Sequence, residues 1–117
     1  MMNLGKQMCA ALEAHLNGGR AKPPEAGRLL WDAFCALSRT RTYHSAGPNP
    51  ISYAEIRAWC DLMRVPFQPQ HVQIIMAMDA AWIADFHQTR RMADGVKRLP
   101  QQSGHALTPA LFDLVAG

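Results

Sequence analysis

A long helical pattern between Trp59 and Arg91 constrains the fold of this chain more than any other feature. Its centre, residues 74–83, is an almost unbroken apolar run. Apolar side chains recur at helical spacing before, within and after that run: Val72, Ile75, Met78, Trp82 and Phe86. This periodicity predicts an amphipathic helix from about Pro69 to Met92, with one face in the core.

One acidic residue, Asp79, interrupts the apolar run. It lies one helical turn after Ile75 and one turn before Ile83, so it should border the core. A carboxylate in that position is costly unless it is paired. We therefore expect a structural salt bridge or a cap for a backbone amide rather than a catalytic role, with Arg57 or Arg64 of the preceding helix as partner.

The composition favours helix over sheet. The 117 residues include seven methionines and three tryptophans, with many alanines and few β-branched residues. We expect an all-α fold, a compact bundle of about four helices with a long loop between helices 2 and 3 and a short C-terminal helix or a flexible tail. The predicted helical domain spans 1–93, with its core in 24–92 and an N-terminal amphipathic helix at 3–17. Residues 94–117 are predicted as a linker and a short C-terminal segment, with a helix over 108–115.

Local signals place the other helices. Asn17-Gly18-Gly19 is a stop for the first helix, whose apolar stripe must dock on the same chain or on another subunit. The second helix is predicted from about Pro24 to Ser38, and the third opens with a capping box formed by Ser52 and Glu55. The predicted core consists of Leu30, Trp31, Phe34, Ile56, Trp59, Met63, Ile75, Met78, Asp79, Trp82 and Phe86.

The segment Arg39–Pro50 is predicted as an exposed loop. It has one glycine, two prolines and no apolar periodicity. Loops of about a dozen residues are uncommon in compact domains and are often functional.

No catalytic or metal-binding pattern occurs. The five histidines and three cysteines show no C-x-x-C, H-x-x-x-H or H-E-x-x-H spacing. No serine or cysteine is paired with a base in the sequence pattern, and Cys9, Cys35 and Cys60 read as reduced, apolar core residues. We predict a protein that is not an enzyme and takes neither metal nor cofactor.

The chain should be cytoplasmic. No apolar run approaches the roughly 20 residues that cross a bilayer. Residues 1–18 are interrupted by Lys6, Glu13 and His15, which argues against a signal peptide or anchor.

Nucleic-acid binding is a weaker alternative. Helices 3 and 4, joined by residues 65–68, can be read as a helix-turn-helix with Gln70, His71 and Gln73 facing bases. However, the net charge is only +3, and the front of the fourth helix has no lysine or arginine for phosphates.

Three segments in order carry a resemblance to a known family. They are Leu30-Trp31-Asp32-Ala33-Phe34, the stretch from Gly47 to Trp59 (GPNPISYAEIRAW), and Met76-Ala77-Met78-Asp79-Ala80-Ala81-Trp82. Over roughly Leu29 to Trp82 the chain resembles small tail-module proteins of tailed bacteriophages and prophages, the tail assembly chaperones or their frameshifted extensions. The resemblance implies a non-enzymatic helper that keeps the tape-measure protein soluble and brings tail-tube subunits to it, in the cytoplasm of the bacterial host.

The resemblance also suggests a protein partner. Our hypothesis for partner-binding residues combines the N-terminal stripe and the loop: Leu4, Met8, Leu12, Arg39, Arg41, Tyr43 and His44. The alternative is a phage-encoded interaction module that inhibits a host defence or regulatory complex. Nucleic acid and membrane are not expected as partners, and a homo-oligomer is left open.

Overall fold

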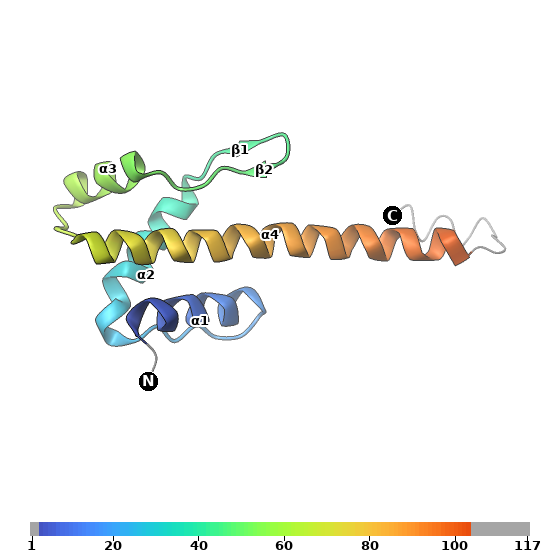
Figure 1. Ribbon diagram of the computed structural model, residues 1–117, viewed down its shortest axis with the longest axis horizontal. Helices are drawn as coiled ribbons and strands as arrows, with labels where there is room; N and C mark the ends of the chain where they lie inside the picture. The colour runs from blue at the N-terminus through green and yellow to red at the C-terminus, as the bar shows by residue number, and fades with distance from the viewer. Residues whose placement is uncertain (1–2, 104–117) are drawn as a thin grey trace. The chain divides into compact units, whose positions relative to one another are not determined.

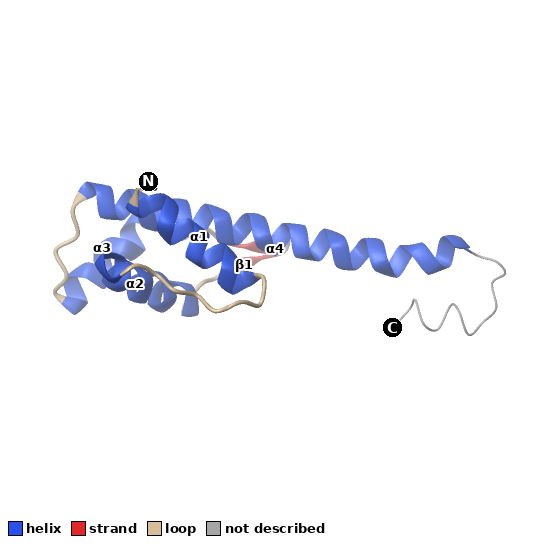
Figure 2. Ribbon diagram, turned by 90° about the horizontal axis from the view of Figure 1, so that it is seen from below, coloured by secondary structure: helices blue, strands red, loops and turns tan. Residues whose placement is uncertain are grey.

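The computed structural model describes residues 3–103 (Figures 1 and 2). Within them the elements follow in the order α1 (Leu4–Leu16), the 3-10 turn η1 (Glu25–Gly27), α2 (Arg28–Arg39), β1 (Tyr43–His44), β2 (Gly47–Pro48), α3 (Tyr53–Met63) and α4 (Pro69–Ser103). The chain forms two compact units, one up to Ala84 and one from Asp85 on. The mostly helical architecture confirms the predicted fold class.

The first unit packs three helices around the start of α4. In Figure 1, α2 crosses behind the part of α4 that precedes Ala84, with α1 on one side of it and α3 and the hairpin on the other. The core cluster draws on all four helices and on Ile51, which lies between the hairpin and α3: Met8, Leu12, Leu30, Ala33, Phe34, Leu37, Ile51, Ile56, Ile75 and Met78.

Helix α1 begins and ends where its local signals predict. The side chain of Asn3 accepts the amide of Lys6 at 2.8 Å, and Asn17 forms the C-cap before Gly18 at φ 89°. Its apolar stripe docks within the same chain, because Met8 and Leu12 belong to the core cluster.

The second helix starts later than the predicted Pro24. The 3-10 turn η1 comes first, and its last residue, Gly27, is buried against α1. A Cβ atom at Gly27 would lie 2.3 Å from the Sδ atom of Met8. A side chain here would force the buried side chain of Met8 to move, so glycine allows the close approach of α1 to the start of α2.

The segment 39–50 is the predicted long connection between the second and third helices, and most of its residues are exposed, but it contains a short hairpin that was not predicted. The segment forms an antiparallel hairpin in which Tyr43 pairs with Pro48 and His44 with Gly47. Arg41, Gly47 and Pro48 are buried, while Tyr43 and His44 are exposed. Strands of two residues are too short to show an alternating pattern in the sequence.

The predicted capping box of α3 is confirmed. The amide of Glu55 donates to Ser52 Oγ at 3.1 Å, and the amide of Ser52 donates to Glu55 Oε1 at 2.9 Å. Ile51 before the cap and Ile56 after it are both buried in the core. The helix ends at Arg64, which adopts the left-handed conformation with φ 58°.

We predict that Arg64→Gly raises the free energy of unfolding by about 0.5 kcal/mol. A residue with a Cβ atom costs about 1 to 2 kcal/mol in the left-handed conformation, and glycine removes this strain. Part of the gain is offset because glycine has more conformational freedom to lose from the unfolded chain. Urea titration measures the change. The matched control is Arg57→Gly inside the same helix, which should lower stability by about 1 kcal/mol. Equal losses in both variants would contradict the role of Arg64 as a strained cap.

The structure buries Leu30, Phe34, Ile56, Ile75 and Met78, as the sequence suggested. The predicted core residues Trp31, Trp59 and Trp82 are partly buried and pack against the cluster.

Met63 is not a core residue. It is 59% exposed, because it lies in the last turn of α3, where the chain turns away. Phe86 belongs to the second unit, where its ring contacts His87 at a centroid distance of 5.5 Å.

Helix α4 continues to Ser103, eleven residues beyond the predicted end at Met92. The residues after Met92 include Ala93, Lys97, Arg98 and Leu99, which are good helix formers, and a single Gly95 costs a helix only about 1 kcal/mol. The linker predicted from Asp94 therefore begins as helix. The helix predicted over 108–115 lies outside the described residues. Across 3–103, no helix is long and apolar enough to cross a membrane.

Candidate partner-binding groove

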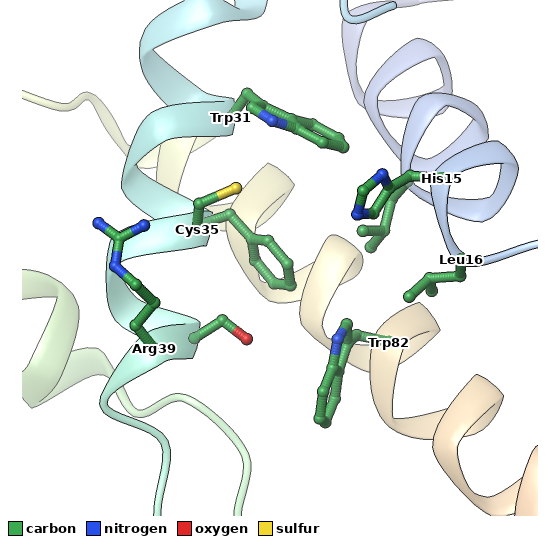
Figure 3. A pocket seen from close by; sticks show the side chains of 9 residues that line it. His15, Leu16, Trp31, Cys35, Arg39 and Trp82 are labelled. Atoms are coloured by element: carbon green, nitrogen blue, oxygen red, sulfur yellow. The ribbon is translucent and has the colours of Figure 1, made fainter. Parts of the chain in front are cut away.

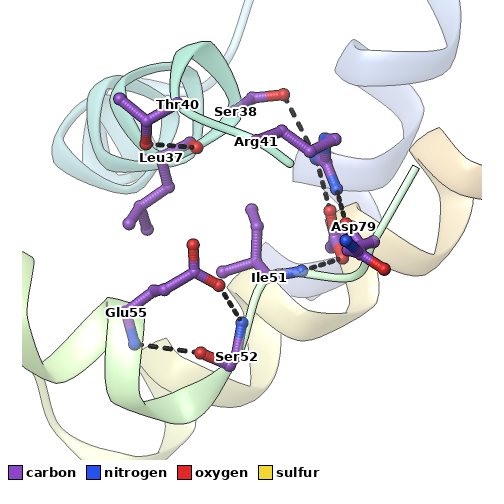
Figure 4. Close-up of polar contacts among 9 residues, drawn as sticks. Leu37, Ser38, Thr40, Arg41, Ile51, Ser52, Glu55 and Asp79 are labelled. Atoms are coloured by element: carbon purple, nitrogen blue, oxygen red, sulfur yellow. Dashed lines mark hydrogen bonds and ion pairs between the residues drawn. The ribbon is translucent and has the colours of Figure 1, made fainter. Parts of the chain in front are cut away.

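Asp79 is the centre of a buried polar network (Figure 4). Its side chain is 3% exposed, and its two oxygens accept from different partners. Oδ1 accepts from Arg41 Nη2 at 2.6 Å, and Oδ2 accepts the amide of Ile51 at 2.9 Å. Both expected roles of Asp79, salt bridge and backbone cap, are present.

The partner predicted for Asp79 is wrong. Arg57 is exposed and lies 4.0 Å from Asp61 on its own helix, and Arg64 is the exposed cap of α3. The true partner, Arg41, comes from the segment before the hairpin.

Arg41 links the hairpin to α2 and α4. Its Nη1 donates to the carbonyl of Asn49 at 3.0 Å, and Nη2 also donates to Ser38 Oγ at 3.1 Å. The guanidinium carbon lies 4.0 Å from the centre of the Trp82 ring, a cation–π contact. With its side chain 2% exposed, Arg41 holds the fold together and offers no surface to a partner.

A groove lies between α1, α2 and α4 of the first unit (Figure 3). Its volume is about 350 Å³. Its lining is apolar at the base and aromatic at the sides: Leu12, His15, Leu16, Trp31, Phe34, Cys35, Ser38, Arg39 and Trp82. We call it the α1–α2–α4 groove.

Aromatic side chains from three helices shape this groove. The rings of His15 and Trp31 meet edge to face with their centroids 6.0 Å apart, across the gap between α1 and α2. Trp82 comes from α4, and its ring also contacts Arg41. Partly exposed tryptophans are typical of surfaces that bind other proteins.

Cys35 is a groove residue with a perturbed thiol. Burial raises its pKa, the positive charge of Arg39 opposes that rise, and the negative charge of Asp32 adds to it. A raised pKa leaves less thiolate at neutral pH, so the thiol is a weak nucleophile. Burial, with a smaller contribution from Glu13, likewise raises the pKa of Cys9.

We predict that iodoacetamide alkylates Cys35 more slowly in the folded chain than in urea at the same pH. The raised pKa and the partial burial both reduce attack, because the thiolate is the reacting species. The folded-state rate should rise as the pH is increased toward the raised pKa. Peptide-resolved mass spectrometry of timed samples measures the rate, and equal rates in both states would contradict the prediction.

The structure separates the residues that the sequence suggested for partner binding. Met8 and Leu12 are buried, although Leu12 contributes to the groove base. Arg39 is exposed at the groove edge. Tyr43 and His44 are exposed on the hairpin, away from the groove lining.

Leu4 lines a second hollow of about 630 Å³ between the starts of α1 and α4. Its other lining residues are Asn3, Gly5, Gln70, His71, Gln73, Ile74 and Ala77. The Nδ1 atom of His71 accepts the amide of Gln68 at 2.9 Å, so this histidine caps the start of α4. From Val65 to Thr89 the chain has no lysine or arginine, and nothing at the front of α4 favours phosphate binding.

The described residues contain no group of three histidine, cysteine, aspartate or glutamate side chains that could hold a metal ion. The α1–α2–α4 groove, with two partly exposed tryptophans in its lining, is the candidate binding site of the first unit. This groove could not be predicted from the sequence, because its walls come from three separate helices. The signal available was the set of aromatic residues on the inner faces of the second and fourth helices.

The chain was compared with known protein families, curated proteins and solved structures. Residues 7–84 match the family model described as phage tail assembly chaperone. No curated protein and no solved structure matches the chain. The matched range includes every residue of the groove and all three segments that carry the resemblance. The match therefore confirms the resemblance to this family. The family is non-enzymatic, in agreement with the prediction from the sequence.

Proposed function

Because the chain belongs to the phage tail assembly chaperone family, we propose that it binds a helical segment of the tape-measure protein in the α1–α2–α4 groove during virion assembly. The tail-tube protein is the second candidate client. The observation that carries the proposal is the groove itself, with Trp31 and Trp82 partly exposed on its walls.

The size of the groove sets what it can accept. An α-helix with its side chains is about 10 Å across, so a volume of about 350 Å³ holds a few side chains and not a whole helix. An amphipathic helix presents such side chains at positions i, i+3 or i+4, and i+7 of one face. The groove therefore suits one apolar stripe of a client helix.

Such binding explains how a small helical protein can act as a chaperone. Covering an apolar stripe removes the surface through which a long, unassembled helical protein would aggregate. Ordering a client segment costs about 2 to 5 kcal/mol, which offsets much of the contact energy and keeps the complex reversible. Reversibility is required because the client must be handed on to the growing tail. The proposed place of action is the cytoplasm of the bacterial host.

Co-expression tests the proposal. The tape-measure protein is produced alone and together with the full chain, and the soluble fraction and the co-purifying complex are measured. We expect a soluble complex only in the presence of the chain. A tape-measure protein that is equally soluble alone and does not co-purify would contradict the proposal. Specific capture of a host defence or regulatory complex instead would favour the inhibitor alternative.

A further inference from the structure

We infer that the α1–α2–α4 groove selects client helices that carry a carboxylate beside their apolar anchors. This inference rests on the proposed function and adds the chemical class of the client. It follows from the charges around the groove and not from the apolar base.

Arg39 places a positive charge at the edge of the groove, and its effect on the pKa of the lining residue Cys35 is larger than the opposite effect of Asp32. Arg39 is the charged residue of the lining, and none of the nine lining residues is acidic. A neighbouring hollow of about 380 Å³, on another side of α1, is lined by Arg20 and Lys22 and also lacks an acidic residue. Glu13 and Asp32 are exposed on α1 and α2, but neither lines the groove.

The positions of these groups match the geometry of a docked helix. Anchors that enter beside Trp31 and Trp82 leave the flanking positions of the client helix at the rim of the groove. A glutamate three or four residues from an anchor lies on nearly the same face, within reach of Arg39 on α2. Arginine binds a carboxylate through two parallel hydrogen bonds, so this contact would also fix the register of the client.

The charge contributes selectivity, and the apolar contacts contribute most of the affinity. Because Arg39 is exposed, one ion pair changes the affinity by only about 1.5- to 5-fold. The preference between clients of opposite charge is a more sensitive measure, since attraction in one case becomes repulsion in the other.

The test uses two synthetic helical peptides with the same leucine anchors at i, i+3 and i+7, one with glutamate and one with lysine at the flanking positions. Binding to the full chain is measured by fluorescence anisotropy. We expect the glutamate peptide to bind about fivefold more tightly at low salt, and the difference to vanish near 1 M salt, where screening reaches about 3 Å.

Two charge reversals on α2 provide the matched comparison. Arg39→Glu should invert the preference between the peptides. Arg28→Glu should leave it unchanged, because Arg28 is exposed in the first turn of α2 and does not line the groove. Circular dichroism checks that both variants are folded.

Four outcomes would overturn the inference. One is equal binding of the two peptides with no effect of Arg39→Glu. Another is that neither peptide binds while the tape-measure protein still co-purifies, in which case the proposed function stands and the inference alone fails. A third is that a peptide of residues 106–117 binds more tightly than the glutamate peptide, which would assign the groove to a segment of the chain's own sequence. Self-association abolished by Arg39→Glu would assign it to a second copy.

Discussion

Asp79→Ala should lower the free energy of unfolding by about 3 to 5 kcal/mol, the usual cost of removing one partner from a buried ion pair. The variant leaves the guanidinium of Arg41 buried without its carboxylate and leaves the amide of Ile51 without its acceptor. Both losses act on the same contact between the hairpin and α4. Urea or thermal unfolding followed by circular dichroism measures the change.

Two further variants separate this effect from a general sensitivity to mutation. Asp61→Ala removes an exposed pair with Arg57 and should change stability by less than about 0.5 kcal/mol. The double variant Arg41→Met with Asp79→Leu should recover much of the loss, because it removes both buried charges together. A variant Asp79→Ala that melts like the wild type but no longer binds its client would show that Asp79 acts in binding and not in folding.

Trp31→Ala should weaken client binding by about 30-fold, which corresponds to about 2 kcal/mol and is typical of a tryptophan at the centre of an interface. Trp31 forms one wall of the groove and is partly exposed, so its indole is available to a client helix. Titration of a labelled client segment with the full chain measures the affinity. Trp31→Phe keeps an aromatic wall and should lose only part of the effect.

Leu29→Ala is the control for this prediction. Leu29 is a large apolar residue on the same helix, 48% exposed, and it does not line the groove. Its replacement should leave affinity within about twofold, as for an ordinary surface substitution. If both variants bind the client as tightly as the wild type does, the client does not use the groove. The unfolding curve of each variant shows whether a lost affinity is only lost folding.

The helices were predictable because their signals are local. Ser52 and Glu55 are three residues apart, and the turn at Asn17 and Gly18 directly follows the helix that it ends. The burial of Asp79 also followed from its neighbours in the helix. Its partner did not, because Arg41 lies 38 residues away and the two arginines of the preceding helix appeared equally suitable.

The hairpin and the groove depend on tertiary structure. Arg41 is drawn inward by Asp79, and the hairpin forms because this contact closes the segment between α2 and α3. The structure also gives a physical meaning to the third segment of the family resemblance. In Met78-Asp79-Ala80-Ala81-Trp82, the aspartate accepts the amide of Ile51, the residue before the N-cap of α3, and the tryptophan stacks on Arg41.

The stacking of Arg41 on Trp82 has a consequence for recognition. The indole that faces the groove is held from behind by a guanidinium whose other hydrogen bonds are all to the fold. An interface side chain that becomes immobilised on binding costs about 0.5 to 1.5 kcal/mol in lost rotamer freedom. Trp82 has already lost that freedom in the free protein, so in the proposed complex the groove is a pre-organised surface for its client, set by a buried arginine outside the groove lining.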